Sequence, residues 1–304
     1  MSKGSKTVCR HAVAAAAIIA AAFLGGCRSN QPSGPMVFAP TDGELRPASL
    51  EYATLARTHN ARVAQLDRLW GRAHVRMAWI DEEGDRQEDG GEGHLQWRRP
   101  AMALSLGKLG EPFVWIGMDA SRFWLLSRRD DVAQVGTHAS ITLDEASRLG
   151  LPVPPAELPP MMGLAALPEP GTRNEPTVHE DPASGRIGVQ LPRREGGYWQ
   201  LEFDPERLHL VRVAMVSEDG FELLTSDLTD YERIRPRGGE ETEVPTRVLV
   251  LDPRSGAELS LSLGSVDDGW AGRRNKLPDA AFDFESLVEL QGPFEVVDLD
   301  APAG

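Results

Sequence analysis

Few residues of this chain have the types and the spacing that catalysis or metal binding requires. Zinc sites use clustered histidine, cysteine or carboxylate ligands, but the histidines after residue 26 show no HxH or HExxH spacing: His59, His74, His94, His138, His179 and His209. The acidic run at 81–89 lacks EF-hand spacing, and no GxSxG elbow, phosphate-binding loop or dinucleotide fingerprint occurs. The sequence therefore predicts no catalytic residue, no metal site and no cofactor. A pair of catalytic carboxylates from distant parts of the chain would leave no motif in the sequence. A hydrolase therefore stays as the weakest alternative.

The residue for which the sequence does indicate chemistry is Cys27. Residues 1–11 contain three lysine or arginine residues and no acid, and residues 12–24 are thirteen apolar residues in succession. As a helix that run spans about 20 Å, which is short of the ~30 Å hydrocarbon core of a bilayer. It therefore fits the apolar region of an export signal better than a transmembrane helix. The alternative is an ordinary cysteine beside a buried, alanine-rich helix.

The segment Leu24-Gly25-Gly26-Cys27 resembles the lipobox of bacterial lipoproteins. The resemblance implies that the Cys27 sulfur receives a diacylglyceryl group, that the chain is cut before it, and that the new amine is acylated, for example with palmitate. We therefore expect a signal peptide at 1–26, a flexible tether at 27–45 and a single domain at 46–304. Acyl chains would anchor that domain to a membrane of the bacterial envelope. Arg28 stands where some inner-membrane lipoproteins have aspartate, which favours the outer membrane, facing the periplasm.

The charge of the chain argues against two kinds of partner. The formal charge is −14, and loss of the three basic residues of the signal makes it −17. Nucleic acid and anionic headgroups are bound by a surplus of lysine and arginine, so neither is expected as a partner. The cysteines are Cys9 and Cys27. The exported domain must therefore fold without a disulfide, by burial of apolar residues.

One helix and about twelve strands are expected after residue 45. Residues 49–72 read as a helix with Ser49 as N-cap and Gly71 as stop, and one face carries Tyr52, Leu55, His59, Val63, Leu66 and Trp70. The apolar period then changes to two, which predicts strands at 73–80, 93–99, 102–106, 113–118, 122–127, 132–137, 186–191, 198–203, 208–216, 221–231, 246–251 and 258–265. The acidic residues 81–91 and the charge run 240–243 are expected in hairpin tips, and a helical turn is expected at 143–149.

Strands at spacings near ten residues, with turn signals between them, favour an antiparallel meander. A sheet of about 11–12 strands must curl because strand twist accumulates. We therefore predict an α+β fold. It would be a curved, antiparallel, open (incomplete) β-barrel with an N-terminal amphipathic helix and a helical, proline-rich lid on the concave side.

The candidate binding site consists of apolar residues. Five tryptophans lie in predicted strands and either fill an ordinary core or line a cavity for an apolar ligand: Trp79, Trp97, Trp115, Trp124 and Trp199. Leu55, Val63 and Leu66 of the helix are expected to face the same space. Residues 151–167, which include Met161 and Met162, are too apolar for a plain exposed loop. They either pack flat on the barrel or form a lid, or a membrane-touching wedge, at the rim of the cavity.

Two parts of the chain resemble the LolA/LolB-like superfamily of envelope lipoprotein and lipid carriers. The first is the succession of helix, small residue, strand, Gly-rich turn, strand and Arg-Pro over 61–100, followed by the aromatic hairpin 113–126. The second is the strand pair 245–263 with the closing pattern Leu277-Pro278-Asp279 and then Phe282 and Phe284. The resemblance implies an incomplete barrel with helices at its mouth and an apolar cavity for acyl chains. It transfers no binding residue, because neither a cavity arginine nor a protruding leucine loop aligns.

These features together favour a non-enzymatic, membrane-anchored envelope lipoprotein that binds or transfers lipids or acylated lipoproteins in an apolar cavity. The alternative is a scaffold or assembly lipoprotein whose barrel is filled and whose surface docks another envelope protein. Lipid retained in an organic extract of the purified protein would separate the two.

Overall fold

The structure, a computed structural model, describes residues 46–80, 84–108, 111–171, 176–194, 196–268 and 279–301. All of them belong to the compact unit Val37–Gly304. The predicted signal peptide, the tether and Cys27 lie outside the described residues, as does the Leu277-Pro278 pair of the closing motif. Among the helices that are described, none combines the length and the apolar content needed to cross a bilayer.

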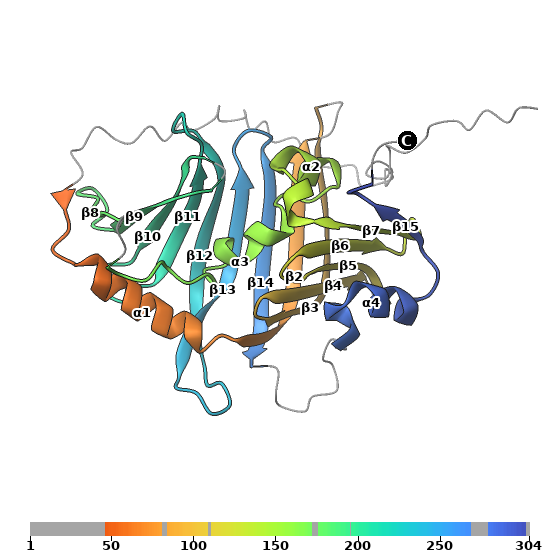
Figure 1. Ribbon diagram of the computed structural model, residues 1–304, viewed down its shortest axis with the longest axis horizontal. Coiled ribbons are helices and arrows are strands. Elements are labelled where there is room, and N and C mark those ends of the chain that lie inside the picture. The colour runs from red at the N-terminus through yellow and green to blue at the C-terminus, as the bar shows by residue number, and fades with distance from the viewer. Residues whose placement is uncertain are drawn as a thin grey trace, which may run out of the picture. The chain divides into compact units, whose positions relative to one another are not determined.

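The described strands form one sheet of fifteen strands, in the order β1-β8-β9-β10-β11-β12-β13-β14-β2-β3-β4-β5-β6-β7-β15 (Figure 1). Their bounds are β1 Arg46–Pro47, β2 Arg68–Ile80, β3 Arg86–Arg98, β4 Ala101–Lys108, β5 Glu111–Met118, β6 Arg122–Ser127, β7 Val132–Thr137, β8 Val178–Glu180, β9 Ile187–Pro192, β10 Tyr198–Phe203, β11 Leu210–Val216, β12 Glu222–Ile234, β13 Thr242–Asp252, β14 Ala257–Asp267 and β15 Glu295–Asp298.

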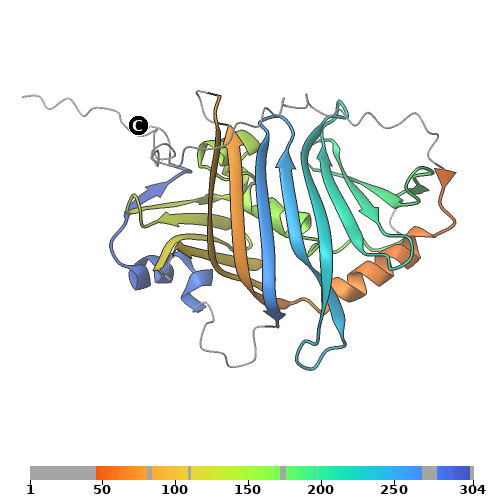
Figure 2. The same cartoon turned by 180° about the vertical axis from the view of Figure 1, so that it is seen from behind.

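The sheet is open and almost wholly antiparallel. β1 and β15 lie at its two edges. The pairing of β7 with β15 is parallel, and the other strand pairs are antiparallel. The curvature of the sheet is visible from behind (Figure 2). The predicted open antiparallel meander is confirmed, but the predicted count of 11–12 strands is too low. β1, β8 and β15 are only two to four residues long, too short for an alternating pattern to reveal them.

The described residues form four α-helices beside the sheet: α1 Tyr52–Ala64, α2 Leu143–Arg148, α3 Leu158–Met161 and α4 Phe284–Gln291. Short 3-10 turns lie at His138–Ser140, Pro155–Glu157 and Asp279–Phe282. The helical turn expected at 143–149 is α2, whose N-terminus has a full capping box between Thr142 and Glu145. The short helix α4 was not predicted, although Asp283 caps it by accepting a hydrogen bond from the Ser286 amide.

The predicted helix 49–72 is too long at both ends. α1 begins at Tyr52 and ends at Ala64, and Gln65 is its C-cap. From Arg68 the backbone pairs instead with β3, residue Arg68 opposite Arg98. Trp70 therefore belongs to β2 and not to the helix. A helical period in the side chains could not reveal this, because the strand partner that captures residues 68–72 lies about twenty-five residues away.

The β2–β3 hairpin is longer than its side-chain pattern predicts. Residues 86–91, placed in an acidic loop by the sequence, continue β3, with Arg86 opposite Ile80. Backbone pairing needs only amide and carbonyl groups, so polar side chains and glycines can extend a strand that no alternation marks. The charge run 240–243, by contrast, does lie at the β12–β13 hairpin tip, where β13 begins at Thr242.

Both faces of the sheet are covered by helices, and neighbouring residues of one strand serve different cores. Phe123 belongs to the main core, which also contains α1 and the 151–167 segment. Trp124, the next residue of β6, points to the opposite face and packs with Phe284 and Leu287 of α4. Gly117, opposite Trp124 in the β5–β6 register, leaves the space that the indole occupies.

Candidate functional site

The helix α1 presents its buried face to the concave side of the sheet. Its buried residues are Tyr52, Leu55, Ala56, His59 and Val63. Glu51, the N-cap residue, makes no side-chain cap hydrogen bond, so the helix depends mainly on burial of this face for its stability. Leu55 and Ala56 are fully buried in the main core. Val63 is also buried, and its carbonyl accepts a hydrogen bond from Arg99 Nη2 at 2.7 Å.

Leu66 lies after the helix, in the turn that leads to β2, and not on the helical face predicted for it. Its side chain is nevertheless buried in the main core. The Leu66 carbonyl accepts a hydrogen bond of 2.9 Å from the indole Nε1 of Trp97 in β3. Trp97 thus fixes the chain where it passes from the helix into the sheet.

The 151–167 segment crosses the concave side of the sheet, with α3 in front of the central strands (Figure 1). Its large apolar side chains are buried in the main core: Leu151, Val153, Leu158, Met161, Met162, Leu164 and Leu167. Met161 is 0% and Met162 1% exposed. In this structure the segment fills the concave face, and the two methionines lie inside it instead of at an exposed rim.

Side chains of α1 hold the end of this segment, and we call these bonds the α1 contact. Asn60 makes two hydrogen bonds to the backbone of Leu167, from Nδ2 to the carbonyl at 2.9 Å and from the amide to Oδ1 at 2.7 Å. His59 Nε2 lies 2.9 Å from the Ala165 carbonyl. The Tyr52 hydroxyl donates to the Pro168 carbonyl at 2.8 Å. A helix and a segment more than a hundred residues apart in sequence are joined in this way.

The segment is held to the sheet mainly by apolar packing. Ser226 of β12 donates to the Met161 carbonyl at 2.7 Å, and α3 packs against β11. The segment's backbone bonds within the described residues stay local, as from Leu164 to Pro159 at 2.9 Å, and it joins no strand of the sheet. It can therefore leave the sheet without breaking a strand pair.

His59 is the histidine of the α1 contact. Burial lowers the pKa of His59 to about 4, with the charge of Arg62 adding to the effect and the hydrogen bond to Ala165 opposing it. Since the carbonyl can only accept, Nε2 must carry the proton. Nδ1 is buried and has no hydrogen-bond partner among the described residues. The ring edge of His59 also meets the Phe203 ring, with centroids 5.7 Å apart.

The five tryptophans do not line one space. Trp97 is in the main core, and Trp199 packs against that core from the end of β10. Trp79 is half-buried near the end of β2. Trp115 and Trp124 lie in the separate core beneath α4, so their placement beside the helix face of Leu55 is wrong. Alternation showed that each tryptophan is on a face, but the face depends on what covers the sheet.

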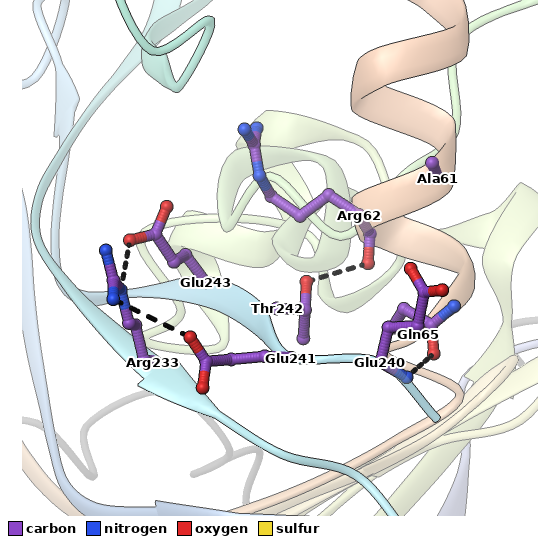
Figure 3. A pocket seen from close by; sticks show the side chains of 8 residues that line it. All are labelled: Ala61, Arg62, Gln65, Arg233, Glu240, Glu241, Thr242 and Glu243. Atoms are coloured by element: carbon purple, nitrogen blue, oxygen red, sulfur yellow. Dashed lines mark hydrogen bonds and ion pairs between the residues drawn. The ribbon is translucent and has the colours of Figure 1, made fainter. Parts of the chain in front are cut away.

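A polar hollow lies between the end of α1 and the β12–β13 hairpin (Figure 3). Its volume is about 410 Å³, and it is lined by Ala61, Arg62, Gln65, Arg233, Glu240, Glu241, Thr242 and Glu243. Thr242 Oγ1 donates to the Arg62 carbonyl at 3.3 Å, and the Glu240 amide donates to Gln65 Oε1 at 3.2 Å. These contacts fasten the hairpin tip to the helix. A second open hollow of about 420 Å³ lies along β12 to β14 and is also mostly polar.

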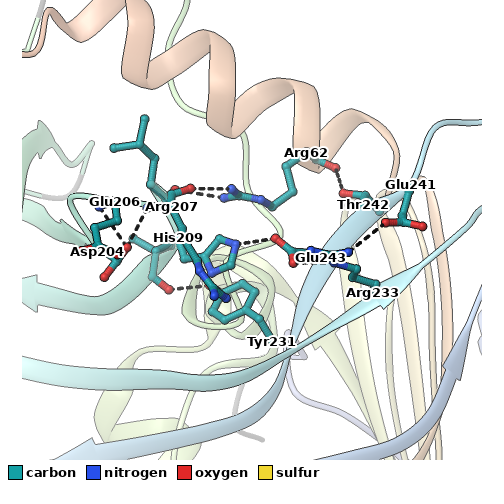
Figure 4. A network of polar contacts seen from close by, with 12 residues as sticks. Arg62, Asp204, Glu206, Arg207, His209, Tyr231, Arg233, Glu241, Thr242 and Glu243 are labelled. Carbon is teal, nitrogen blue, oxygen red and sulfur yellow. Dashed lines mark hydrogen bonds and ion pairs between the residues drawn. The ribbon is translucent and has the colours of Figure 1, made fainter.

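A network of charged groups continues from this hollow into the sheet (Figure 4). His209 Nε2 lies 2.7 Å from Glu243 Oε2, and its ring stacks on Tyr231 with centroids 4.0 Å apart. Arg62 Nη1 donates to the Leu208 carbonyl at 3.0 Å. The arrangement ties α1 to β11, β12 and β13. The sequence offered one signal, the charge run 240–243, whereas His209 looked like an isolated histidine.

The pKa values in this network shift with burial. Burial lowers the pKa of His209, although the hydrogen bond that His209 donates to Glu243 opposes this shift. Burial also raises the pKa of Tyr231. Burial would raise the pKa of Glu243, but hydrogen bonds from His209 and Arg233 bring it below its usual value. The hydrogen bonds and ion pairs of this network hold its charges and protons in place.

The described residues offer no metal site, and the sequence matches no known family. Within the described ranges, no group of three histidine, cysteine or carboxylate residues is placed to hold a metal ion. No protein-family profile matches the chain, and no curated protein matches its sequence.

Several solved structures have a similar fold. A LolA superfamily protein from Nitrosomonas europaea is 16% identical at a TM-score of 0.46, over 77% of this chain and 98% of its own. A proposed outer membrane lipoprotein-sorting protein domain from Vibrio parahaemolyticus is 11% identical at a TM-score of 0.45, over 77% and 97%. A DUF1329 family protein from Desulfovibrio piger is 10% identical at a TM-score of 0.43, over 78% and 98%. The first of these descriptions names the superfamily that the sequence resembles, and at such identities the likeness concerns the fold alone.

Proposed function

We propose that this protein is a non-enzymatic carrier or acceptor that binds acyl chains of lipids or acylated lipoproteins on the concave face of its sheet. Ligand entry requires the 151–167 segment to move aside as a lid. The observation that carries the proposal is that this face is covered by an apolar segment that belongs to no strand of the sheet. A ligand that replaces the segment would bury the same apolar area, at roughly 25 cal/mol per Å².

We further propose that the protein is a lipid-anchored protein of the bacterial envelope. Residues 1–26 would be a signal peptide, residues 27–45 a tether and residues 46–304 the binding domain. Cys27 would carry the lipid that anchors the protein in the bacterial envelope, at the outer membrane and facing the periplasm. An anchored carrier of this kind would collect or deliver acyl chains within the length of its tether.

The α1 contact provides a test, because Asn60→Ala removes both bonds to Leu167. Loss of these bonds weakens the closed state by about 1–3 kcal/mol. If the lid must open, the apparent affinity for a fluorescent fatty acid then rises by about 5- to 150-fold. The titration uses the full chain with Cys27→Ser, in which no lipid attached to the chain itself competes with the probe.

Asp283→Ala is the matched control. It removes the N-cap of α4, which typically costs about 1 kcal/mol, but α4 packs in the other core. This variant should melt earlier with unchanged fatty-acid affinity. An Asn60→Ala protein that melts earlier and binds no better would contradict the lid.

A second function is favoured by the filling of the concave face. Leu55, Met161 and Met162 leave no more than 1% of their surfaces exposed, as in a barrel that holds only its own side chains. Such a protein would be a scaffold that docks another envelope protein. Mass spectrometry of an organic extract of the protein purified from membranes decides between them, since a carrier retains lipid beyond its own anchor.

A further inference from the structure

The α1 contact contains a buried imidazole whose two nitrogens have different surroundings. Nε2 donates to the Ala165 carbonyl at 2.9 Å. Nδ1 is enclosed by the core, and no acceptor among the described residues faces it. A proton added at Nδ1 would create a positive charge that is buried without an anion. The contact that closes the concave face is therefore compatible with neutral His59 only.

Each element packed around His59 favours the neutral ring. On α1, Arg62 lies one turn further on and its positive charge opposes a second one. From β10 the neighbour is the uncharged ring of Phe203, while Glu202 of that strand points away and pairs with Arg186. The 151–167 segment contributes the Ala165 carbonyl. No carboxylate among the interactions that act on His59 in the described structure would stabilise the imidazolium.

We propose that His59 is an acid-sensitive latch: its protonation at Nδ1 releases the 151–167 segment from α1 and opens the concave face. The inference rests on the proposed function in one respect, that the face so opened is the one that takes up acyl chains. The opening itself does not depend on any ligand. Acidification would thus shift the protein from its closed to its open form, and neutral pH would close it again.

The expected change in the ratio of open to closed protein follows from the pKa of His59 in each form. Once released into water, His59 regains the ordinary pKa of 6.5, whereas burial holds it at about 4 in the closed form. At pH 5 the open form then gains about twentyfold relative to the closed form, compared with pH 7. Asn60 and Tyr52 carry no charge in this range, so their bonds to residues 167 and 168 oppose opening equally at both values.

Thiol labelling measures the opening directly. Met161→Cys is introduced into the full chain with Cys9→Ser and Cys27→Ser, so that the fully buried position 161 carries the only thiol. Its reaction with a dipyridyl disulfide is divided by that of Phe221→Cys, a position 66% exposed, which removes the pH dependence of the reagent. We expect this ratio to rise about twentyfold from pH 7 to pH 5, and to change less than threefold when His59→Gln or His59→Asn is added.

Two controls separate the latch from general loosening by acid. Ala133→Cys places the thiol in the fully buried core beneath α4, and its ratio should stay low at both pH values. His209→Gln removes a different buried histidine and should leave the rise at position 161 intact. A flat ratio for Met161→Cys, an equal rise at Ala133→Cys, or an undiminished rise in both His59 variants would overturn the proposal.

A fluorescent fatty acid, titrated at pH 7 and pH 5, keeps the latch apart from the proposed function. If labelling and fatty-acid affinity rise together, both stand. If labelling rises while no fatty acid binds at either pH, the latch stands and the carrier function fails.

Discussion

The indole of Trp97 fixes the turn between α1 and β2. Its Nε1 donates to the Leu66 carbonyl inside the core. Trp97→Phe keeps most of the apolar contact but leaves a buried carbonyl without this donor, so we expect a loss of about 1–3 kcal/mol in the free energy of unfolding. Trp199→Phe, at a half-buried position, should cost less. Urea titrations measure both, and equal losses would contradict the role given to the hydrogen bond.

A second residue-scale prediction concerns acid stability. Burial lowers the pKa of His209, so below pH 6.5 the unfolded chain takes up a proton there more readily than the folded one. The contribution of the neutral, buried His209 to the free energy of unfolding is therefore complete above the ordinary histidine pKa, and it is lost as the pH falls below 6.5. His209→Gln should make the free energy of unfolding less dependent on pH between 7 and 5. Urea titrations at three pH values test this, and a slope equal to that of the wild type would speak against it.

At the scale of elements, the close approach of β3 and β4 depends on a glycine. A Cβ at Gly93 would overlap the backbone carbonyl of Ser105 in β4, and neither backbone can yield without loss of strand pairing. Gly264 of β14 has nothing within 4 Å of a Cβ. We predict that Gly93→Ala destabilises by about 2–3 kcal/mol or more, and that Gly264→Ala is neutral or stabilises by up to about 1 kcal/mol. Thermal melts of the pair should separate clearly, and similar melting temperatures would show that the sheet relaxes.

The packing of the helix α1 in the main core can also be tested. Ala56 is fully buried in the main core, so Ala56→Phe adds a ring to a core that also contains the 151–167 segment. If the segment stays in place, we expect a loss of about 1–3 kcal/mol. If the segment is a lid, the ring should expel it, and the melting temperature should then fall together with faster thiol labelling at Met161→Cys. Unchanged stability and labelling would mean that the core has room to spare.

At the scale of the whole molecule, the predicted anchor has a direct test. Cys27→Ser removes the sulfur that would take the diacylglyceryl group, so the full-length precursor should accumulate uncleaved. Cys9→Ser, inside the signal, should leave processing unchanged. Intact-mass measurement and detergent partitioning follow both variants. A Cys27→Ser protein with the mature mass in the detergent phase would disprove the lipoprotein assignment.

The features that depend on neighbours along the chain could be predicted from the amino-acid pattern. Alternation located β6, β7 and β10 to the residue, because the side chains of a strand repeat every two residues wherever the strand lies. Turn signals made successive strands antiparallel partners. The buried face of α1 from Tyr52 to Val63 also followed from its period. Each of these properties is local, and the pattern that encodes it is local too.

Which elements cover each face of the sheet could be seen only in the folded protein. Nothing near Trp124 in the sequence shows that α4, some 160 residues later, covers it. The bond between Asn60 and Leu167 spans 107 residues. Whether the 151–167 segment lines a space or fills it depends on contacts between residues equally far apart in the sequence. Filling is a matter of volume summed over distant side chains. A pattern records only that a residue is apolar and on which period, so the same sequence pattern would suit an empty barrel or a full one.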